Sequence, residues 1–240
     1  MIDRGYFRFK KFNCRHLSSS MKVGVDAVLL ASWADIRQCR KVLDVGTGCG
    51  VIALICAQRC PDVHVDAIDV HIPSVGEAQL NFNNSPWGGR LDAFVADFNS
   101  FSGSGYDLII SNPPFFNSGI INPSGERMIA RHQDSLSPTS LLSGGKRLLN
   151  PGGSIAMIFP ADQLDTVVDE AGGHGFFLGR YMKIRGNPNA KVKRVLTQFY
   201  AGEDAELIDE GETQILEIMD NEGNYTPGYV ALGKDLYLKF

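Results

Sequence analysis

Short apolar runs alternate with longer segments of helical periodicity through the middle of the chain. Val, Ile and Leu dominate the short runs, and such residues between turn signals predict strands. The predicted strands are 41–45, 63–69, 91–97, 106–111 and 153–160. The spacing of apolar positions predicts helices over 50–60, 73–83 and 140–149. The runs "FFLGRYMKIRG" and "VKRVLTQFYA" then predict a pair of strands that closes the sheet at one edge.

Regular alternation of strands and helices indicates a parallel sheet with helices on both faces. The predicted fold is α/β, with a Rossmann-like doubly wound, mostly parallel seven-stranded sheet and an antiparallel strand at one edge. No Pro- or Ser-rich linker and no internal repeat interrupts the sequence, so we predict a single domain over 1–240. Its core spans 41–201, after a basic N-terminal segment, 1–40, and before an acidic segment and C-terminal tail, 202–240.

Composition places the chain among ordinary globular proteins. Its 240 residues are 44% hydrophobic and 21% charged, which suffices for a sizeable core. No apolar run approaches the length of about 18 residues that a membrane span needs, and no signal peptide is recognisable, so the expected location is cytoplasmic. The five cysteines lack zinc-finger spacing, which favours reduced structural thiols over a metal site.

The net charge of −4 conceals an uneven distribution along the chain. Residues 1–24 contain six Lys and Arg side chains against one Asp, and residues 171–202 contain six and no acid. Residues 203–222 carry nine acids and no base. The two basic segments are compatible with solvated faces and equally with binding to a polyanion.

Polar residues and glycines follow the predicted strands, at the edge of the sheet where α/β proteins bind ligands. These residues are Asp44, Gly46, Gly48, Gly50, Asp69 and Asp97. Glycines without side chains let a ligand approach the backbone. Asp69 is placed to accept hydrogen bonds from ribose hydroxyls, and Asp97 from an adenine amino group. Acids at three successive strand ends therefore predict a nucleoside ligand.

The segment "LDVGTGCG", residues 43–50, has the spacing G-x-G-x-G, with Val51 where a dinucleotide fingerprint carries its third glycine. This spacing fits poorly with NAD. It resembles the D/E-x-G-x-G-x-G turn of class I S-adenosylmethionine methyltransferases. That resemblance implies S-adenosyl-L-methionine as cofactor. The implied cofactor-binding residues in and after the strands are Asp44, Gly46, Gly48, Gly50, Asp69, Asp97, Phe98 and Asn112.

The motif "NPPF", Asn112 to Phe115, follows the predicted fourth strand. It resembles the signature of methyltransferases that act on planar nitrogens. An exocyclic amino group is a poor nucleophile because its lone pair is delocalised into the ring. The Asn112 side-chain oxygen and the Pro113 carbonyl can accept its N–H bonds and direct the lone pair at the methyl group. Pro114 stiffens the turn, and Phe115 can stack on the target, so Asn112, Pro113, Pro114 and Phe115 are the predicted catalytic residues.

Several segments in serial order extend the resemblance to the bacterial tRNA(Val) adenine-37 N6-methyltransferases. They are "MKVGVDAVLLASWA", "LDVGTGCG", "NNSPW", "SNPPFF", "ARHQDSLSPTSLL" and "YTPGYVALGKDLYLKF". By this resemblance Val23, Gly24 and Asp26 help to enclose the cofactor, although an ordinary capped helix would account for them equally well. The implied partner is tRNA, with no membrane, no metal and no obligate protein partner.

Basic side chains near the predicted site are candidates for contacts with RNA phosphates. They are Arg8, Lys10, Lys11, Arg127, Arg131, Lys191, Lys193 and Arg194. Two alternatives remain open at this point. An RNA guanine-N2 methyltransferase would use the same motif, because guanine also offers an amino group on a planar ring. A protein-glutamine N5-methyltransferase is disfavoured because only about forty residues precede the glycines, too few for the helical substrate domain of that family.

Overall fold

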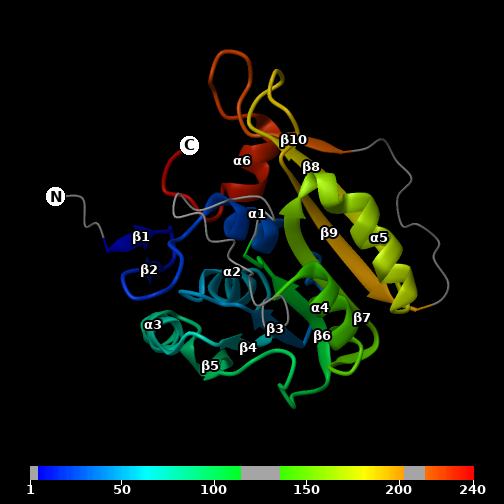
Figure 1. The fold of residues 1–240 in the computed structure, drawn as a ribbon. Coiled ribbons are helices and arrows are strands. Elements are labelled where there is room, and N and C mark those ends of the chain that lie inside the picture. Colours follow the sequence, from blue (N-terminus) through cyan, green and yellow to red (C-terminus); the bar gives the residue numbers. More distant parts are fainter. Residues whose placement is uncertain (1–4, 115–135, 203–213) are drawn as a thin grey trace, which may run out of the picture.

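The computed structural model describes residues 5–114, 136–202 and 214–240 (Figure 1). A small antiparallel hairpin, β1 (Tyr6–Arg8) and β2 (Asn13–Arg15), lies apart from the main sheet. The sequence pattern had not predicted this hairpin, because its strands are only three residues long.

The main sheet has eight strands in the order β10-β8-β9-β7-β6-β3-β4-β5. Their bounds are β3 (Lys41–Val45), β4 (His64–Asp69), β5 (Leu91–Val95), β6 (Tyr106–Ser111), β7 (Leu149–Pro160), β8 (Phe176–Arg185), β9 (Arg194–Ala201) and β10 (Ile215–Glu217). All neighbours are parallel except β9, which is antiparallel to both β7 and β8. Strand order reverses between β3 and β6, and this switch point is where open α/β sheets bind their ligands.

The predicted Rossmann-like, mostly parallel sheet is therefore confirmed. Seven strands match the predicted ones, and the three-residue β10 adds an eighth beyond β8. The antiparallel strand is β9, which belongs to the predicted closing pair. It lies between β7 and β8 rather than at the edge of the sheet, where the sequence predicts it. The sequence could not show this order, because the β8–β9 connection is a hairpin that folds back against β7.

Helices cover both faces of the sheet (Figure 1). They are α1 (Val25–Trp33), α2 (Val51–Arg59), α3 (Ile72–Asn83), α4 (Pro138–Gly145), α5 (Leu164–Gly173) and α6 (Pro227–Gly233), with short 3₁₀ turns at Gly88–Arg90 and Ala161–Gln163. Alternate residues of each strand enter opposite layers, so that Ile110 packs with α1 and α2, while Ile109 packs with α4 and α5. Among the described helices, none has both the length and the apolar character that crossing a membrane requires.

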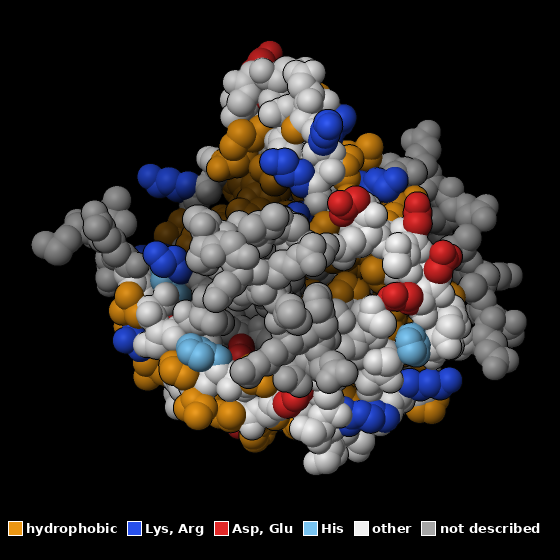
Figure 2. All heavy atoms as spheres, in the orientation of Figure 1, with side chains coloured by type: hydrophobic (Ala, Val, Ile, Leu, Met, Phe, Trp, Pro, Cys, Tyr) orange, Lys and Arg blue, Asp and Glu red, His pale blue; other side chains and the backbone are white. Residues whose placement is uncertain are grey.

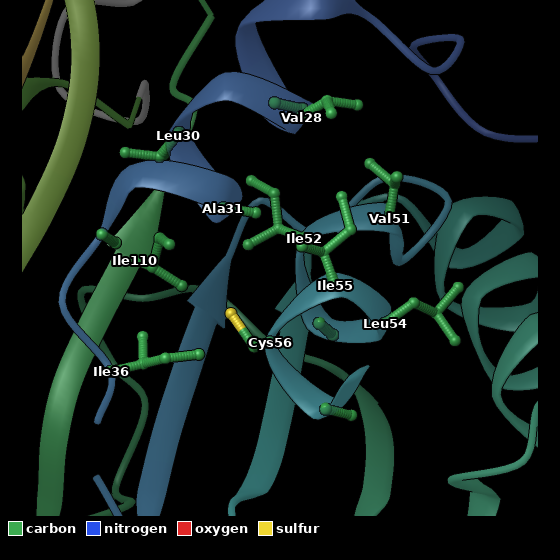
Figure 3. Packing of buried hydrophobic residues seen from close by; sticks show 14 of the residues in the cluster. Val28, Leu30, Ala31, Ile36, Val51, Ile52, Leu54, Ile55, Cys56 and Ile110 are labelled. Carbon is green, nitrogen blue, oxygen red and sulfur yellow. The ribbon is translucent and has the colours of Figure 1, made fainter. Parts of the chain in front are cut away.

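The space-filling view shows hydrophobic side chains gathered in a hollow beside the C-terminal segment, with Lys and Arg side chains at its rim (Figure 2). On one face of the sheet, α1 and α2 pack against each other. Ala31 of α1 points toward Ile52 of α2, while Leu30 points to the other side of α1 and lies above Ile110 of β6 (Figure 3). This apolar layer, in which Leu30 and Ile55 are fully buried, holds α1 against the sheet.

Candidate active site

Three glycines shape the connection from β3 to α2, residues 46–50, which we call the glycine turn. Gly46, Gly48 and Gly50 have φ angles of 71°, 56° and 83°, a backbone conformation that side chains disfavour. A Cβ at Gly50 would lie 2.5 Å from the Phe82 ring, whereas one at Gly48 would meet no atom of the described residues within 4 Å. Gly50 therefore permits close packing of α2 on α3, while the backbone at Gly48 has space beside it for a ligand.

Asp44 lies beneath the glycine turn, in β3, and is fully buried. Its Oδ2 accepts hydrogen bonds from Thr47 Oγ1 at 2.6 Å and from the Ala53 N–H at 3.3 Å. Its buried Oδ1 has no partner among the described residues. Burial raises the pKa of Asp44 to about 7 although the two hydrogen bonds lower it, and the nearby Asp69 carboxylate raises it further.

Asp69, at the end of β4, holds the glycine turn through backbone donors. Its Oδ2 accepts the Gly48 N–H at 3.0 Å, and its Oδ1 accepts the His71 N–H at 2.9 Å. The side chain is half-buried, and each oxygen keeps a further lone pair for a ligand. The acid predicted to bind ribose thus lies directly against the glycine turn.

Asp97 and Phe98 follow β5 and differ in environment. The Ala96 N–H donates to the Asp69 carbonyl at 3.1 Å, which places Asp97 beside the end of β4. Asp97 is exposed, and its Oδ1 accepts the Asn99 N–H at 2.9 Å. Phe98 is buried, and its ring is so close to Gly144 of α4 that a Cβ there would lie 2.6 Å from it.

Asn112 and Pro113 continue β6 past Ser111, whose Oγ donates to the Val45 carbonyl at 2.8 Å. Asn112 is half-buried, Pro113 is buried and Pro114 is exposed. The Asn112 Oδ1 is itself buried and has no hydrogen-bond partner within the part of the chain that the structure describes. Three predicted site residues lie outside the described residues: Phe115, Arg127 and Arg131.

Two buried acceptors, Asp44 Oδ1 and Asn112 Oδ1, therefore lie at the same end of neighbouring strands, and neither has a partner within residues 5–114, 136–202 and 214–240. Val45 pairs with Ser111 in the parallel register of β3 and β6, so each acceptor is one residue from that pair. A buried carboxylate or amide oxygen is costly to leave unpaired. Ligands that bring N–H donors to both positions would remove that cost, which is the chemistry that a cofactor with an ammonium group and a substrate with an amino group supply.

The segment Val23 to Asp26 lies at the start of α1. The Val23 N–H donates to His16 Nδ1 at 3.3 Å, and Gly24 caps the helix. Asp26 Oδ2 accepts from Arg194 Nε at 3.0 Å in a half-exposed ion pair. Sequence reasoning had assigned Asp26 to the cofactor and Arg194 to RNA, and did not anticipate that they pair with each other.

The remaining basic candidates are at the surface. Arg8, Lys10 and Lys11 are exposed in and after β1, and Lys10 Nζ also donates to the Lys234 carbonyl at 2.6 Å. Lys191 and Lys193 are exposed immediately before β9. These two are the candidates of the second basic segment whose side chains face solvent.

Two residues of α3 that the sequence did not reveal, Glu77 and Asn81, bind the backbone of the N-terminal segment. The Glu77 carboxylate accepts N–H bonds from Leu17, Ser18 and Ser19 at 2.7 to 3.1 Å. Burial raises the pKa of Glu77, but the backbone donors outweigh it, so the pKa lies below its usual value. The only signal in the sequence was an acid and an amide on the inward face of a helix.

The Asn81 side chain connects the hairpin to the glycine turn. Its Oδ1 accepts the Arg15 N–H at 2.9 Å, and its Nδ2 donates to the carbonyls of Arg15 and Cys49, both at 2.8 Å. The Cys14 Sγ lies 3.5 Å from the Cys49 Sγ at the same place. All five cysteines are buried free thiols, and among the described residues no group of three or more His, Cys, Asp or Glu could hold a metal ion.

Two cavities are relevant to ligand binding. One of about 710 Å³ lies at the amino ends of β6 and β7, where Asp107, Ser154 and Arg180 line it, and so at the opposite end of the sheet from Asn112. The other, of about 300 Å³, lies between the start of α1 and the C-terminal segment. Val23 and Gly24 line this second cavity.

Comparisons with known proteins agree with this geometry. A family model described as "Methyltransferase small domain" matches residues 17–164. A tRNA1(Val) (adenine(37)-N6)-methyltransferase of Bacteroides fragilis is 35% identical over 99% of this chain and 100% of its own. One of Phocaeicola vulgatus is 38% identical over 97% of each. The crystal structure of a predicted O-methyltransferase from Agrobacterium tumefaciens shares the fold, with a TM-score of 0.65 and 18% identity over 88% of this chain and 96% of that one.

Proposed function

Because the chain belongs to the methyltransferase small domain family, and to the branch of the tRNA1(Val) (adenine(37)-N6)-methyltransferases, we propose that it methylates N6 of adenosine 37 in tRNA1(Val) with S-adenosyl-L-methionine as donor. The RNA and the modified nucleotide in this proposal are taken from the names of the relatives. The chemistry follows from the site, and the observation that carries it is a pair of buried acceptors, Asp44 Oδ1 and Asn112 Oδ1, that have no partner among the described residues.

The glycine turn and the acids at three strand ends would hold the cofactor. Its methionine part would lie against the open backbone at Gly48, with its ammonium group donating to Asp44 Oδ1. Asp69 and Asp97 would accept from the ribose and the adenine. The cofactor brings a methyl group that its sulfonium already activates, so the protein needs neither a metal nor a covalent nucleophile.

Asn112 and Pro113 would orient the target amino group. Asn112 Oδ1 and the Pro113 carbonyl accept one N–H each, which draws the nitrogen lone pair out of conjugation and towards the methyl carbon. The new N–C bond forms as the C–S bond breaks, and the amino group then loses one proton to solvent. Since the Asn112 Oδ1 is already buried and has no partner in the part of the chain that the structure describes, little reorganisation would accompany substrate binding.

The hairpin and the segment before β9 would contact the RNA through Arg8, Lys11, Lys191 and Lys193, all exposed. Residues 1–240 would act as one methyltransferase domain, with 1–40 over the cofactor. The target base must leave the anticodon loop stack to reach Asn112, which costs least where the loop is already single-stranded.

Mass spectrometry of nucleosides tests this proposal. A tRNA1(Val) transcript incubated with the protein and labelled S-adenosylmethionine should yield labelled N6-methyladenosine, and a transcript with guanosine at position 37 should yield none. Labelled N2-methylguanosine would instead show a guanine-N2 methyltransferase. No labelled nucleoside from either transcript, with the cofactor shown to bind, would exclude a tRNA1(Val) substrate.

A further inference from the structure

Aromatic rings from both ends of the sequence enclose the cavity of about 300 Å³, which we call the aromatic groove. Its lining residues are Phe7, Val23, Gly24, Val25, Val28, Tyr225, Tyr229, Tyr237, Lys239 and Phe240. The hollow with hydrophobic side chains beside the C-terminal segment in Figure 2 shows its surroundings. The tail that contributes most of these rings has no role in the proposed chemistry.

The rings are fixed in place and yet remain accessible. Phe240 meets Tyr225, Tyr229 and Tyr237 edge-on, with ring centroids 5.5 to 5.8 Å apart and interplanar angles of 85° to 87°. Tyr225 and Phe240 are each 43% exposed. Exposed aromatic surface held by other rings is a preformed platform for a flat ligand, because no ordering entropy is lost on binding.

The charge of the groove favours an anionic ligand. Lys239 is the one charged residue that lines it within the described chain, and the exposed Lys22 directly precedes Val23. A platform of rings beside a lysine is the arrangement with which proteins bind single-stranded nucleic acid. The volume lies at the lower end of the range for ligand pockets, about 300 Å³, and so suits one base rather than a longer segment.

The groove opens at the same end of the sheet as Asn112. Arg194 pairs in register with Pro160, the last residue of β7, and its ion pair with Asp26 brings the start of α1 to that end. Asn112 follows Ser111, which pairs with Met157 of the same strand. Both places are therefore at the end of the sheet where the RNA would have to dock.

We propose that the aromatic groove binds an unstacked nucleobase that flanks the target adenosine, stacked on Tyr225 and Phe240, with its phosphate on Lys239. This inference rests on the proposed function, since it names a second RNA-binding position of the same enzyme. It gives the C-terminal segment a role in substrate selection, by holding a neighbour of the target while the target base enters the site.

Variants at Tyr225 separate stacking from simple apolar contact. Tyr225→Phe keeps the ring and should bind a tRNA1(Val) transcript as the parent does, whereas Tyr225→Leu keeps an apolar side chain and should bind about tenfold more weakly. Phe240→Leu should behave like Tyr225→Leu. Phe94→Leu, at a Phe that is 45% exposed on β5 outside the groove, is the matched control and should change nothing.

Salt dependence separates the base from its phosphate. Tyr225→Leu should lower affinity with an unchanged slope of log K against log salt, while Lys239→Ala should reduce that slope by about one. All these variants should still unfold cooperatively and bind S-adenosylmethionine with parental affinity, although loss of ring contacts should lower the melting temperature of Tyr225→Leu and Phe240→Leu slightly. Parental cofactor affinity excludes misfolding as the cause of weaker RNA binding.

The outcomes distinguish this inference from the function on which it rests. If the parent methylates tRNA1(Val) while Tyr225→Leu and Phe240→Leu bind it with parental affinity, the groove is not a base-binding site and the proposed function stands. Equal weakening by Tyr225→Phe and Tyr225→Leu would also overturn stacking. If the parent neither binds nor methylates the transcript, the proposed function fails and the inference with it.

Discussion

Arg194 Nε donates to Asp26 Oδ2 at 3.0 Å, across 168 positions of sequence. The pair fastens the first turn of α1 to the first residue of β9, and it engages one side of the Arg194 guanidinium, which was predicted to contact RNA. Half-exposed pairs of this kind stabilise by about 0.2–1 kcal/mol, so the contact contributes more to position than to stability.

The RNA contact of the segment before β9 is therefore best tested with Arg194 left intact. Lys191→Ala with Lys193→Ala should weaken tRNA binding and lower the salt slope by about two, while cofactor affinity remains unchanged. Binding titrations over a range of salt concentrations measure both quantities. The control is Arg37→Ala with Arg40→Ala, which removes the same charge from exposed side chains at the other end of the sheet. Equal effects of the two double variants would show only a loss of net charge.

Asp44 should make the cofactor-free protein less stable as the pH rises. Its folded pKa of about 7 lies above the unfolded value, so the folded state holds the proton more tightly between about pH 4 and 7, and stability falls through that interval. At pH 8 the free energy of unfolding of Asp44→Asn should therefore exceed that of the parent by up to about 4 kcal/mol, so that the variant unfolds at a higher denaturant concentration. The difference should vanish near pH 4, and a difference that is constant with pH would contradict the raised pKa.

Glu77→Gln should destabilise the segment that precedes Val23. The carboxylate is the acceptor for the backbone N–H groups of residues 17–19, and an amide nitrogen would face those donors instead. We expect a loss of about 1–3 kcal/mol in the free energy of unfolding at pH 7, with faster proteolysis at residues 16–21. Because the pKa of Glu77 is lowered, its contribution in the parent should disappear as the pH falls below the ordinary range for Glu. Asp62→Asn, at an exposed acid, should be silent in both assays.

Asp69→Ala should weaken S-adenosylmethionine binding in calorimetry by about 1–3 kcal/mol. Two causes combine, since the ligand loses an acceptor and the Gly48 N–H loses the bond that holds the glycine turn. Asp92→Asn, at an exposed acid on β5, serves as the control. Unchanged affinity in Asp69→Ala would remove this residue from the cofactor site.

Asn112→Ala should act on the chemical step rather than on cofactor binding. Loss of an acceptor that engages the amino group at the transition state should lower kcat about 100-fold or more, a far larger effect than any loss of calorimetric affinity for the cofactor. Single-turnover methylation of the transcript measures this rate. Near-normal turnover would contradict the role assigned to the Asn112 Oδ1.

The sequence predicted the fold and the strand-end residues because both depend on local patterns. A β-branched run followed by Asp or Gly marks the end of a parallel strand, and Asp44, Asp69 and Asn112 were recognisable in this way. The three-residue β10 was missed because Ile215–Glu217 is too short for periodicity and lies in an acidic segment. Its Glu217 pairs with Arg185, which also shows that the acidic and basic segments are not separate surfaces.

Long-range polar pairs were beyond sequence reasoning for a different reason. Glu77 binds backbone N–H groups, which every residue except proline has, so no pattern in the partner sequence could reveal it. The Asp26–Arg194 pair joins residues whose surroundings depend on how α1 crosses the sheet. The unpaired oxygens of Asp44 and Asn112 likewise emerge only when burial is known.

The Asn81 side chain joins two segments to α3 with a single amide, since it bonds the hairpin at Arg15 and the glycine turn at Cys49. Asp could not replace Asn81 because its carboxylate cannot donate a hydrogen bond. Leu could not replace it because its side chain can neither donate nor accept one. Hybrid enzymes that exchange the hairpin between relatives would therefore need to transplant α3 in the same module. The boundaries for such chimaeras follow hydrogen bonds rather than the order of residues along the chain.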